Sequence, residues 1–400
     1  MKKIIISLFF VFLFFPSYVN ALEYPKVNSK VVEIYDITDE KVLYEVNSND
    51  ISSIASLTKI ATTITAIESI SNLDEKVTIT REILNTVSSE ASVAGLRAGD
   101  VVTYRDLLYA SMLPSGADAT NSIAILSTGS INNFVNKMNE LALKIGLSNT
   151  HFVNVTGLDD SNHYSTSADV RKLLEYALKN PLFRQIYTTR EYTLTNGMVV
   201  KSTIFKYSNS SIDTSKILGS KTGYTGAAGY CLSSLSSVHE HELVMIVLNA
   251  EHKGINYYNI IDTVQLIDFV NNNYNNQVLV KRGELIKTIP VKLSKISSYK
   301  IYSSKELSKF LPNDYKKEDL SIKYTGLNSL SFKNKVGINV GTIKYYYADE
   351  LIFTQKVKLE KDIQIDFFKI IKKYYYIVIF ILVIIIYACM KVFFRIKKKK

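Results

Sequence analysis

Ser56 and Lys59, in the stretch ISSIASLTKIATT, are the first residues whose types and spacing suit covalent chemistry. Residues three apart lie on the same side of a helical turn, so the two side chains can touch. A serine hydroxyl becomes a nucleophile when a base removes its proton, and a lysine is such a base when burial or a second cation lowers its pKa. The spacing alone is weak evidence, because Ser297 and Lys300 repeat it with nothing functional about them.

Two later motifs strengthen this interpretation. The run SGAD begins at Ser115, directly after Pro114, where a helix must stop and a loop can present a hydroxyl to a cleft. The run KTG at 221–223 leads into strand-like segments and offers a cation, a hydroxyl and backbone N–H groups along one line. Its glycine allows another chain to approach closely, which suits a peptide bound like an added strand with a carboxylate at its end.

The elements that must position these motifs alternate between helical and strand patterns up to about Asn276. Apolar residues at helical spacing predict a helix from Ser56 to Ile70. Capping residues and proline breaks predict further helices at 103–112, from 117, at 131–145, at 167–180 and at 257–274. Alternating apolar residues predict strand pairs at 31–47 and 229–250. We therefore expect an α/β catalytic domain over residues 22–276.

The chain changes character after Asn276. Short alternating segments with turn residues between them predict a small all-β domain over residues 277–366. The run YYYIVIFILVIIIYACMKVFF at 374–394 is long and apolar enough to cross a bilayer as a helix. Its tyrosines suit the membrane interface, and the basic tail at 395–400 is expected on the cytoplasmic side.

The N-terminus has the layout of a secretory signal peptide. Two lysines precede an apolar run, and small residues follow it, so cleavage is expected after Ala21 and the segment 1–21 is expected to be removed. Export at one end and an anchor at the other agree with each other. We expect a single-pass protein of the cell membrane, with its catalytic domain on the extracytoplasmic side.

Composition excludes several classes of protein. The chain has 400 residues, of which 47% are hydrophobic and 21% are charged, and these values are typical of a folded globular protein. Lys2, Lys3 and the basic residues of 372–400 account for nearly all of the net charge of +11, so nucleic acid is not an expected partner. Cys389 lies inside the predicted span, so a disulfide with Cys231 is not expected.

A serine with a lysine, then a serine loop, then Lys-Thr-Gly, in that order, resembles the penicillin-recognising serine enzymes. Among them the chain most resembles the low-molecular-mass penicillin-binding proteins, the D-alanyl-D-alanine carboxypeptidases. The resemblance covers about residues 25–366 and includes ASLTK, GLRAGDVVTYRDLLYASMLPSGADA, HFVNVTGLDDSNHYSTSADV, GSKTGYTGAAGYC and KVGINVGTIKY. It implies the β-lactamase/penicillin-binding transpeptidase-like fold, an antiparallel sheet flanked by helices.

The resemblance also implies a role for each residue of the site. Ser56 would be the acylated nucleophile, Lys59 its general base and Ser115 a proton shuttle. Lys221 and Thr222 would hold the carboxylate of a stem peptide ending in D-Ala-D-Ala, beside Gly223. The backbone N–H groups of Ser56 and Tyr224 would form the oxyanion hole. The enzyme would release D-alanine through an acyl-serine intermediate, β-lactams would acylate it as inhibitors, and no metal or cofactor would be needed.

One departure and two alternatives stay open. The family usually has asparagine where this chain has Ala117, so a catalytically impaired domain that only binds penicillin or peptidoglycan is one alternative. A class A β-lactamase is the other, but it needs a glutamate in a Glu-x-x-Leu-Asn context, and Glu191 is followed by threonine where asparagine belongs. Asp159 and His163 are interpreted as a structural loop beside the site. The run HEH at 239–241 is interpreted as a solvated turn, since no third metal ligand lies near it in sequence.

Overall fold

The computed structural model describes residues 22–204, 212–254 and 256–397, with side chains up to Arg395, and the predicted signal peptide lies outside these residues. The chain separates into two compact units, one ending at Tyr274 and the other beginning at Asn275. Each unit has its own buried apolar cluster. The three motifs all belong to the first unit.

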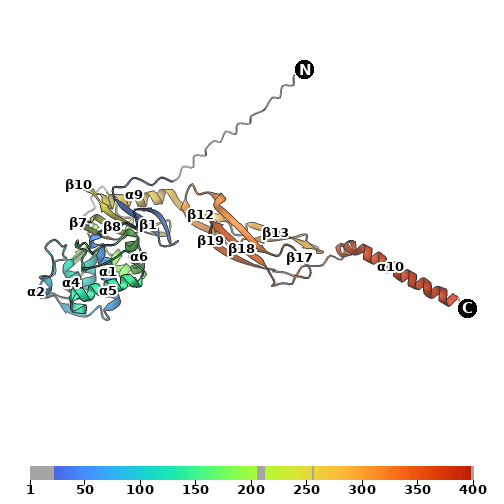
Figure 1. Cartoon of the computed structure of the whole chain (residues 1–400), viewed down its shortest axis with the longest axis horizontal. Coiled ribbons are helices and arrows are strands. Elements are labelled where there is room, and N and C mark those ends of the chain that lie inside the picture. Colours follow the sequence, from blue (N-terminus) through green and yellow to red (C-terminus); the bar gives the residue numbers. More distant parts are fainter. Residues whose placement is uncertain (1–21, 205–211, 255, 398–400) are drawn as a thin grey trace, which may run out of the picture. The chain divides into compact units, whose positions relative to one another are not determined.

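A five-stranded antiparallel sheet forms the centre of the first unit (Figure 1). Its order is β2-β1-β9-β8-β7, so two strands from the start of the chain pair with three that come about 170 residues later. The KTG run lies on β7, an edge strand of this sheet. The strands are β1 (Val31–Asp36), β2 (Lys41–Val46), β7 (Ile217–Thr225), β8 (Gly229–Val238) and β9 (His241–Ala250).

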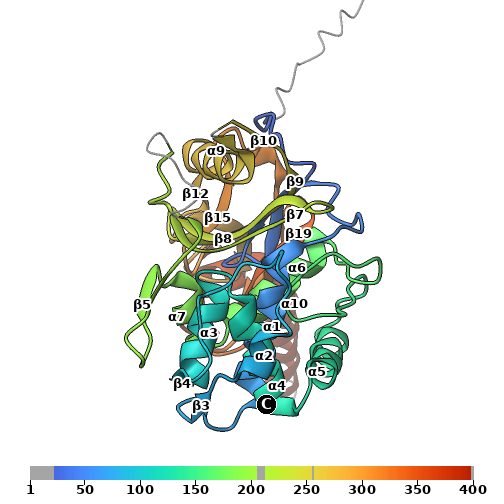
Figure 2. The same ribbon diagram turned by 90° about the vertical axis from the view of Figure 1, so that its left-hand side faces the viewer.

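Helices cover both faces of the sheet, which confirms the expected fold class. Figures 1 and 2 show α9 (Tyr258–Asn273) on one face and the other helices on the opposite face. The larger group buries the main apolar core, which includes alternate residues of β8 and β9. This group comprises η1 (Ala55–Leu57), α1 (Thr58–Ser69), α2 (Arg81–Leu84), α3 (Tyr104–Met112), α4 (Ala117–Thr128), α5 (Ile131–Lys144), α6 (Ser167–Leu178) and α7 (Pro181–Thr188).

Short strand pairs complete the first unit. They are β3 (Lys76–Thr78) with β4 (Val101–Thr103), β5 (Glu191–Thr193) with β6 (Val199–Lys201), and β10 (His252–Lys253) with β11 (Asn256–Tyr257). The β5–β6 hairpin lies between α7 and β7 along the chain.

Local capping chemistry explains most helix ends. Thr103 and Asp106 form a capping box at α3, and Ser130 caps α5, both as the sequence predicts. Two boundaries differ from the prediction. The helix α6 begins at Ser167 as predicted but ends at Leu178 rather than Asn180, and Pro181 opens a further helix, α7, instead of only ending the previous one. Proline suits the first helical position because that residue's N–H has no partner within the helix.

The second unit contains the predicted all-β arrangement followed by a helix. Two three-stranded sheets, β14-β13-β17 and β16-β18-β19, and the pair β12-β15 contribute to a core that includes Ile289, Ile343 and Tyr345. Its strands are β12 (Tyr274–Val280), β13 (Leu285–Lys292), β14 (Ser298–Tyr302), β15 (Leu307–Pro312), β16 (Leu320–Gly326), β17 (Leu330–Ser331), β18 (Asn339–Tyr347) and β19 (Glu350–Lys358), with the turn η2 (Lys317–Asp319) between β15 and β16.

The last helix, α10 (Phe367–Lys397), is long and apolar enough to span a membrane between Phe367 and Arg395. Its backbone departs from helical geometry at Tyr374, with φ −110° and ψ 15°. The predicted apolar span begins at this same residue. The short segment before it, FFKIIKK, is joined to the β-domain, because Lys369 Nζ donates to the Ser294 carbonyl at 2.7 Å.

Candidate active site

Ser56 and Lys59 lie together at the junction of η1 and α1. Lys59 Nζ is 2.9 Å from Ser56 Oγ and 2.7 Å from the carbonyl oxygen of Thr156. The helix proper begins at Thr58, and Ser56 makes no capping hydrogen bond to it. The serine hydroxyl is therefore not used for capping; it lies against the Lys59 amine and also donates to the Thr156 carbonyl oxygen, at 3.4 Å.

Burial changes the chemistry of Lys59. The side chain is only 2% exposed, and this loss of hydration lowers the pKa of its amine to about 7, against the opposing effect of the Asp118 carboxylate. Near neutral pH a large fraction of Lys59 is therefore uncharged. A neutral amine that donates to the Thr156 carbonyl keeps its lone pair for the proton of Ser56.

The turn that carries Ser56 is strained and held from two sides. Ala55 adopts a left-handed φ of 48°, which costs a non-glycine residue about 1 kcal/mol or more. Its carbonyl oxygen accepts a hydrogen bond from Thr58 Oγ1 at 2.8 Å. On the other side Gly157 packs so closely that a Cβ there would stand 1.9 Å from the same oxygen. The orientation of the Ala55–Ser56 peptide group is thus determined by its neighbours.

His163 belongs to this support. Its Nδ1 accepts from the Val153 N–H at 3.2 Å, and its Nε2 lies 2.8 Å from Thr58 Oγ1. Since Thr58 gives its own proton to Ala55, Nε2 must carry hydrogen and donate to Thr58. Burial lowers the pKa of His163 to about 4, so the ring stays neutral at physiological pH. Within this turn the neutral ring acts as a hydrogen-bonding support.

The loop before His163 supplies the second partner of the lysine. Asn154 Oδ1 accepts the N–H groups of Thr156 at 3.1 Å and Gly157 at 2.7 Å, which forms a tight turn. This turn directs the Thr156 carbonyl to Lys59. Sequence reasoning did not assign Asn154 or Thr156 a role. The resemblance of HFVNVTGLDD to the family was the signal that could have found them.

The second motif forms a tight loop between α3 and α4. Ser115 has a left-handed φ of 65° and is 4% exposed, and its Oγ has no hydrogen-bond partner among the described residues. Asp118 anchors the loop, because its carboxylate accepts the N–H groups of Ala94, Gly95 and Leu96 at 2.8, 2.9 and 2.9 Å. Ala117 is fully buried at the first position of α4. Among the described residues the Ser115 hydroxyl is thus a buried polar group that the loop itself does not use.

The third motif lies beside Ser56. A Cβ on Gly223 would be 3.0 Å from both Ser56 N and Ala55 Cβ, so glycine permits β7 to approach η1. Lys221 is 1% exposed, and its Nζ donates to the Thr222 carbonyl at 2.7 Å. Burial and the nearby Lys59 amine lower the pKa of Lys221 well below its usual value.

The residues after the third motif are tied to the loop that contains His163. Thr225 Oγ1 donates to Asp159 Oδ1 at 2.6 Å, and the Ala227 N–H donates to Asp159 Oδ2 at 3.1 Å. Tyr224, between this contact and Gly223, is 56% exposed. Asp159 therefore joins the end of β7 to the opposite wall of the site, as the interpretation of a structural loop predicts.

Glu191, the residue weighed for a β-lactamase reaction, lies on β5. Its carboxylate forms an ion pair with Lys201 on the paired strand, at 2.7 Å, and both side chains are more than half exposed. A deacylating glutamate must instead hold a water against the acyl-serine. The contact with Lys201 favours a surface role.

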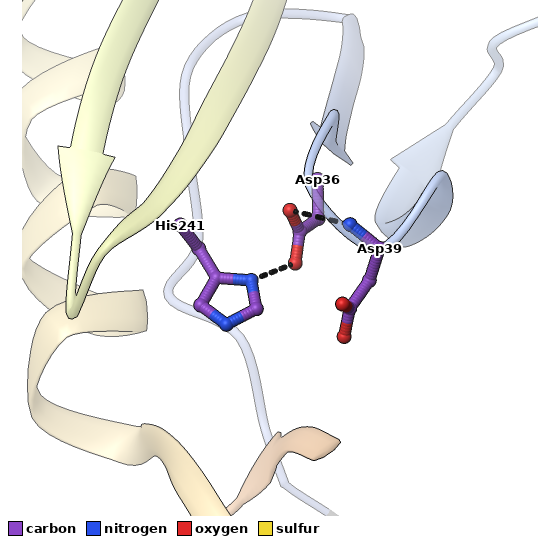
Figure 3. A group of neighbouring side chains, drawn as sticks. All are labelled: Asp36, Asp39 and His241. Carbon is purple, nitrogen blue, oxygen red and sulfur yellow. Dashed lines mark hydrogen bonds and ion pairs between the residues drawn. The ribbon is translucent and has the colours of Figure 1, made fainter. Parts of the chain in front are cut away.

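The run at 239–241 differs from its prediction. His239 and Glu240 form the β8–β9 turn, but His241 is buried and its Nδ1 lies 2.7 Å from Asp36 Oδ2 (Figure 3). The expectation of a solvated turn is wrong for His241, because sheet pairing brings β1 beside β9. The other oxygen of Asp36 accepts the N–H groups of Thr38 at 2.9 Å and Asp39 at 3.2 Å. One carboxylate oxygen thus stabilises the β1–β2 turn, and the other joins this turn to His241 on β9.

Both units match known protein families. A family model described as D-alanyl-D-alanine carboxypeptidase matches residues 18–252, and one described as penicillin-binding protein 5, C-terminal domain, matches residues 274–364. The chain is 27% identical over 335 residues to D-alanyl-D-alanine carboxypeptidase DacF of Bacillus subtilis, which covers 81% of this chain and 83% of that protein.

Solved structures agree in fold. A peptidoglycan synthesis regulatory factor (PBP3) of Streptococcus pneumoniae superposes with a TM-score of 0.63 at 22% identity, covering 85% of this chain and 100% of that one. The Streptomyces K15 DD-transpeptidase superposes with a TM-score of 0.55 at 29% identity, covering 62% of this chain and 98% of that one. The share of this chain matched by the second protein is no longer than the first unit.

Proposed function

The chain belongs to the D-alanyl-D-alanine carboxypeptidase family, and from this premise we propose that Ser56 is its acylated nucleophile and Lys59 the general base. The observation that carries the proposal is the 2.9 Å contact between Lys59 Nζ and Ser56 Oγ, made by a buried amine with a pKa of about 7. A fully solvated lysine would be protonated at neutral pH and would not accept the proton.

The reaction follows from this geometry. Ser56 Oγ passes its proton to Lys59 and forms a bond with the carbonyl carbon of the penultimate D-alanine. The oxygen of that carbonyl becomes negative and would be stabilised by the backbone N–H groups of Ser56 and Tyr224. The close approach of β7 to Ser56 N at Gly223 supports this assignment. The C–N bond then breaks, the terminal D-alanine leaves with a proton delivered through Ser115, and water hydrolyses the acyl-serine.

Recognition of the substrate rests on Lys221 and Thr222. Both lie on an edge strand, so an extended stem peptide ending in D-Ala-D-Ala can add beside it as a further strand. The terminal carboxylate would accept a hydrogen bond from the Thr222 hydroxyl. The protonated amine of Lys221 would attract its negative charge. A bound carboxylate raises the pKa of a nearby amine, so substrate favours the protonated form of Lys221 even though burial opposes it.

The absence of asparagine at Ala117 is compatible with this mechanism. The contact that an amide would offer the lysine is supplied here by the Thr156 carbonyl, which the Asn154 turn directs to Lys59. The Ser115 hydroxyl stays available. We therefore favour an active enzyme over a domain that only binds penicillin or peptidoglycan.

We further propose the finer arrangement along the chain. Residues 22–276 are the catalytic domain, 277–366 an all-β spacer, and 374–394 a membrane-spanning helix with the tail 395–400 in the cytoplasm. The apolar stretch of α10 supports the anchor, and its basic end supports the orientation. Peptidoglycan stem peptides are then the substrates on the extracytoplasmic side, and β-lactams are acylating inhibitors.

Release of D-alanine tests the proposal. The purified chain in detergent is expected to release D-alanine from a pentapeptide ending in D-Ala-D-Ala, and Ser56→Ala is expected to release none. Mass spectrometry of the intact protein with benzylpenicillin should show a covalent adduct on the wild type alone. An adduct without D-alanine release would support the binding-only alternative, and rapid turnover of benzylpenicillin would support a β-lactamase.

A further inference from the structure

Thr203 connects the second and third motifs. It follows β6, and its backbone N–H donates to the carbonyl oxygen of Leu113, two residues before Ser115, at 3.0 Å. Its hydroxyl forms a hydrogen bond with the hydroxyl of Thr222, at 2.5 Å. One residue thus holds the loop of Ser115 through its backbone and the edge strand through its side chain.

The direction of the hydroxyl pair follows from what Thr222 must do. A carboxylate only accepts hydrogen bonds, so Thr222 Oγ1 must donate its proton to the carboxylate when substrate is bound. The same oxygen can then only accept from Thr203. The reverse direction would turn a lone pair of Thr222 toward the negative charge. Because a hydroxyl that accepts a hydrogen bond is a better donor, the pair also strengthens the contact with the carboxylate.

We propose that Thr203 is a positioning residue that makes the enzyme selective for substrates with a free terminal carboxylate, by fixing the proton of Thr222 toward that group. The inference rests on the proposed function, in which Thr222 binds the carboxylate. Thr203 acts through Thr222 and does not touch the reacting atoms. Its isolated position in the sequence, between a hairpin and β7, carries no motif that would identify it.

Thr203→Val tests the proposal, because valine keeps the shape of threonine and removes its hydroxyl. Two peptides are compared, one ending in D-Ala-D-Ala with a free carboxylate and the other with the same end as a carboxamide. For the carboxylate, KM is expected to rise about ten-fold with kcat nearly unchanged, as for the loss of a hydrogen bond to a charged group present in both ground and transition states. For the carboxamide, kcat/KM is expected to stay within about two-fold of the wild type, because no charge is recognised.

Thr203→Ser is the matched rescue variant, since it restores a hydroxyl, and it is expected to recover most of the preference for the carboxylate. Thr128→Val is the control. It removes the same hydroxyl at the far end of α4, where Thr128 Oγ1 donates to the Ala124 carbonyl of its own helix. Equal losses on both peptides, an unchanged preference in Thr203→Val, or a serine variant no better than valine would each overturn the proposal. A wild type that releases no D-alanine would instead overturn the proposed function.

Discussion

At Lys59 the needs of stability and of chemistry oppose each other. A lysine inside a helix whose residues from Thr58 to Ala66 are all buried lowers stability while it is charged, because its hydration is lost. The same loss of hydration brings the pKa to about 7 and makes the amine a base at neutral pH. The Thr156 carbonyl offsets part of the penalty by accepting a hydrogen bond. The site thus depends on an interaction that a purely structural core would avoid.

The pH dependence of acylation follows from this pKa. Below about pH 7 Lys59 is mostly protonated and cannot accept the proton of Ser56, and above it the neutral amine predominates. We expect kcat/KM for peptide, and the acylation rate with benzylpenicillin, to rise with pH through a midpoint near 7. Stopped-flow acylation across about pH 5 to about pH 9 measures this midpoint.

Two variants identify the titrating group. Lys59→Arg is expected to be inactive at every pH, since a guanidinium stays charged. His163→Gln is expected to keep the midpoint, because His163 is already neutral throughout this range. A midpoint that moves with His163, or an active Lys59→Arg enzyme, would contradict the assignment of Lys59 as the base.

The junction of η1 and α1 is the element on which the site depends. Two parts of the chain far from it in sequence reach it: the 154–163 loop and the edge strand β7. Gly157 and Gly223 contact the backbone next to Ser56, and the His163 ring acts through the Thr58 hydroxyl. Regular helix geometry alone would not aim the Ser56 N–H into the site, and these contacts hold the strained turn in place.

Gly157→Ala tests the support of this turn. The added Cβ would collide with the Ala55 carbonyl oxygen, at 1.9 Å, and must displace it. The acylation rate with benzylpenicillin is expected to fall about 100-fold or more, as when an oxyanion donor is misplaced. The rate is measured by the appearance of the covalent adduct.

Gly197→Ala is the matched control. Gly197 has φ 84°, almost equal to the 85° of Gly157, but no atom lies within 4 Å of its missing Cβ. Both variants therefore carry the same backbone strain of about 1 kcal/mol, seen as a lower Tm. If both lost acylation equally, strain alone would explain the result and the contact with Ala55 would have no special role.

The whole molecule combines a catalytic unit with a β-domain and an apolar helix. The Streptomyces K15 structure matches 62% of this chain and 98% of its own length, and the matched share is no longer than the first unit. The β-domain has its own core. A separate core supports our proposal that the β-domain is a spacer that takes no part in the chemistry.

Deleting residues 275–366, with Tyr274 joined to the helix at Phe367, tests the spacer. The variant is expected to retain kcat/KM on a soluble pentapeptide within about two-fold, because the three motifs lie in the first unit. Its release of D-alanine from the wall of intact cells is expected to fall strongly, since the site would lie too near the membrane. Equal losses on soluble peptide and on intact wall would exclude a spacer role.

Local interactions explain why much of this protein is predictable from its sequence. The Ser56–Lys59 pair depends on one helical turn, the caps at Thr103 and Ser130 on residues three apart, and the β8–β9 hairpin on alternation around a short turn. The apolar run of α10 depends only on composition and length. None of these needs knowledge of distant contacts.

Contacts between distant segments decided the rest. Burial of Lys59, and with it the pKa, depends on packing of the whole helical layer. Partners of the site come from distant parts of the chain: Thr156 lies at the lysine, Gly157 at Ala55, and Thr203 at the second motif. Thr203 also contacts Thr222 on β7, which is nearer in sequence but lies beyond a hairpin and a connecting segment. The same cause explains the error at His241, which pairs with Asp36 across the sheet. These hydrogen bonds form between residues that only folding brings together, so no local sequence pattern predicts them.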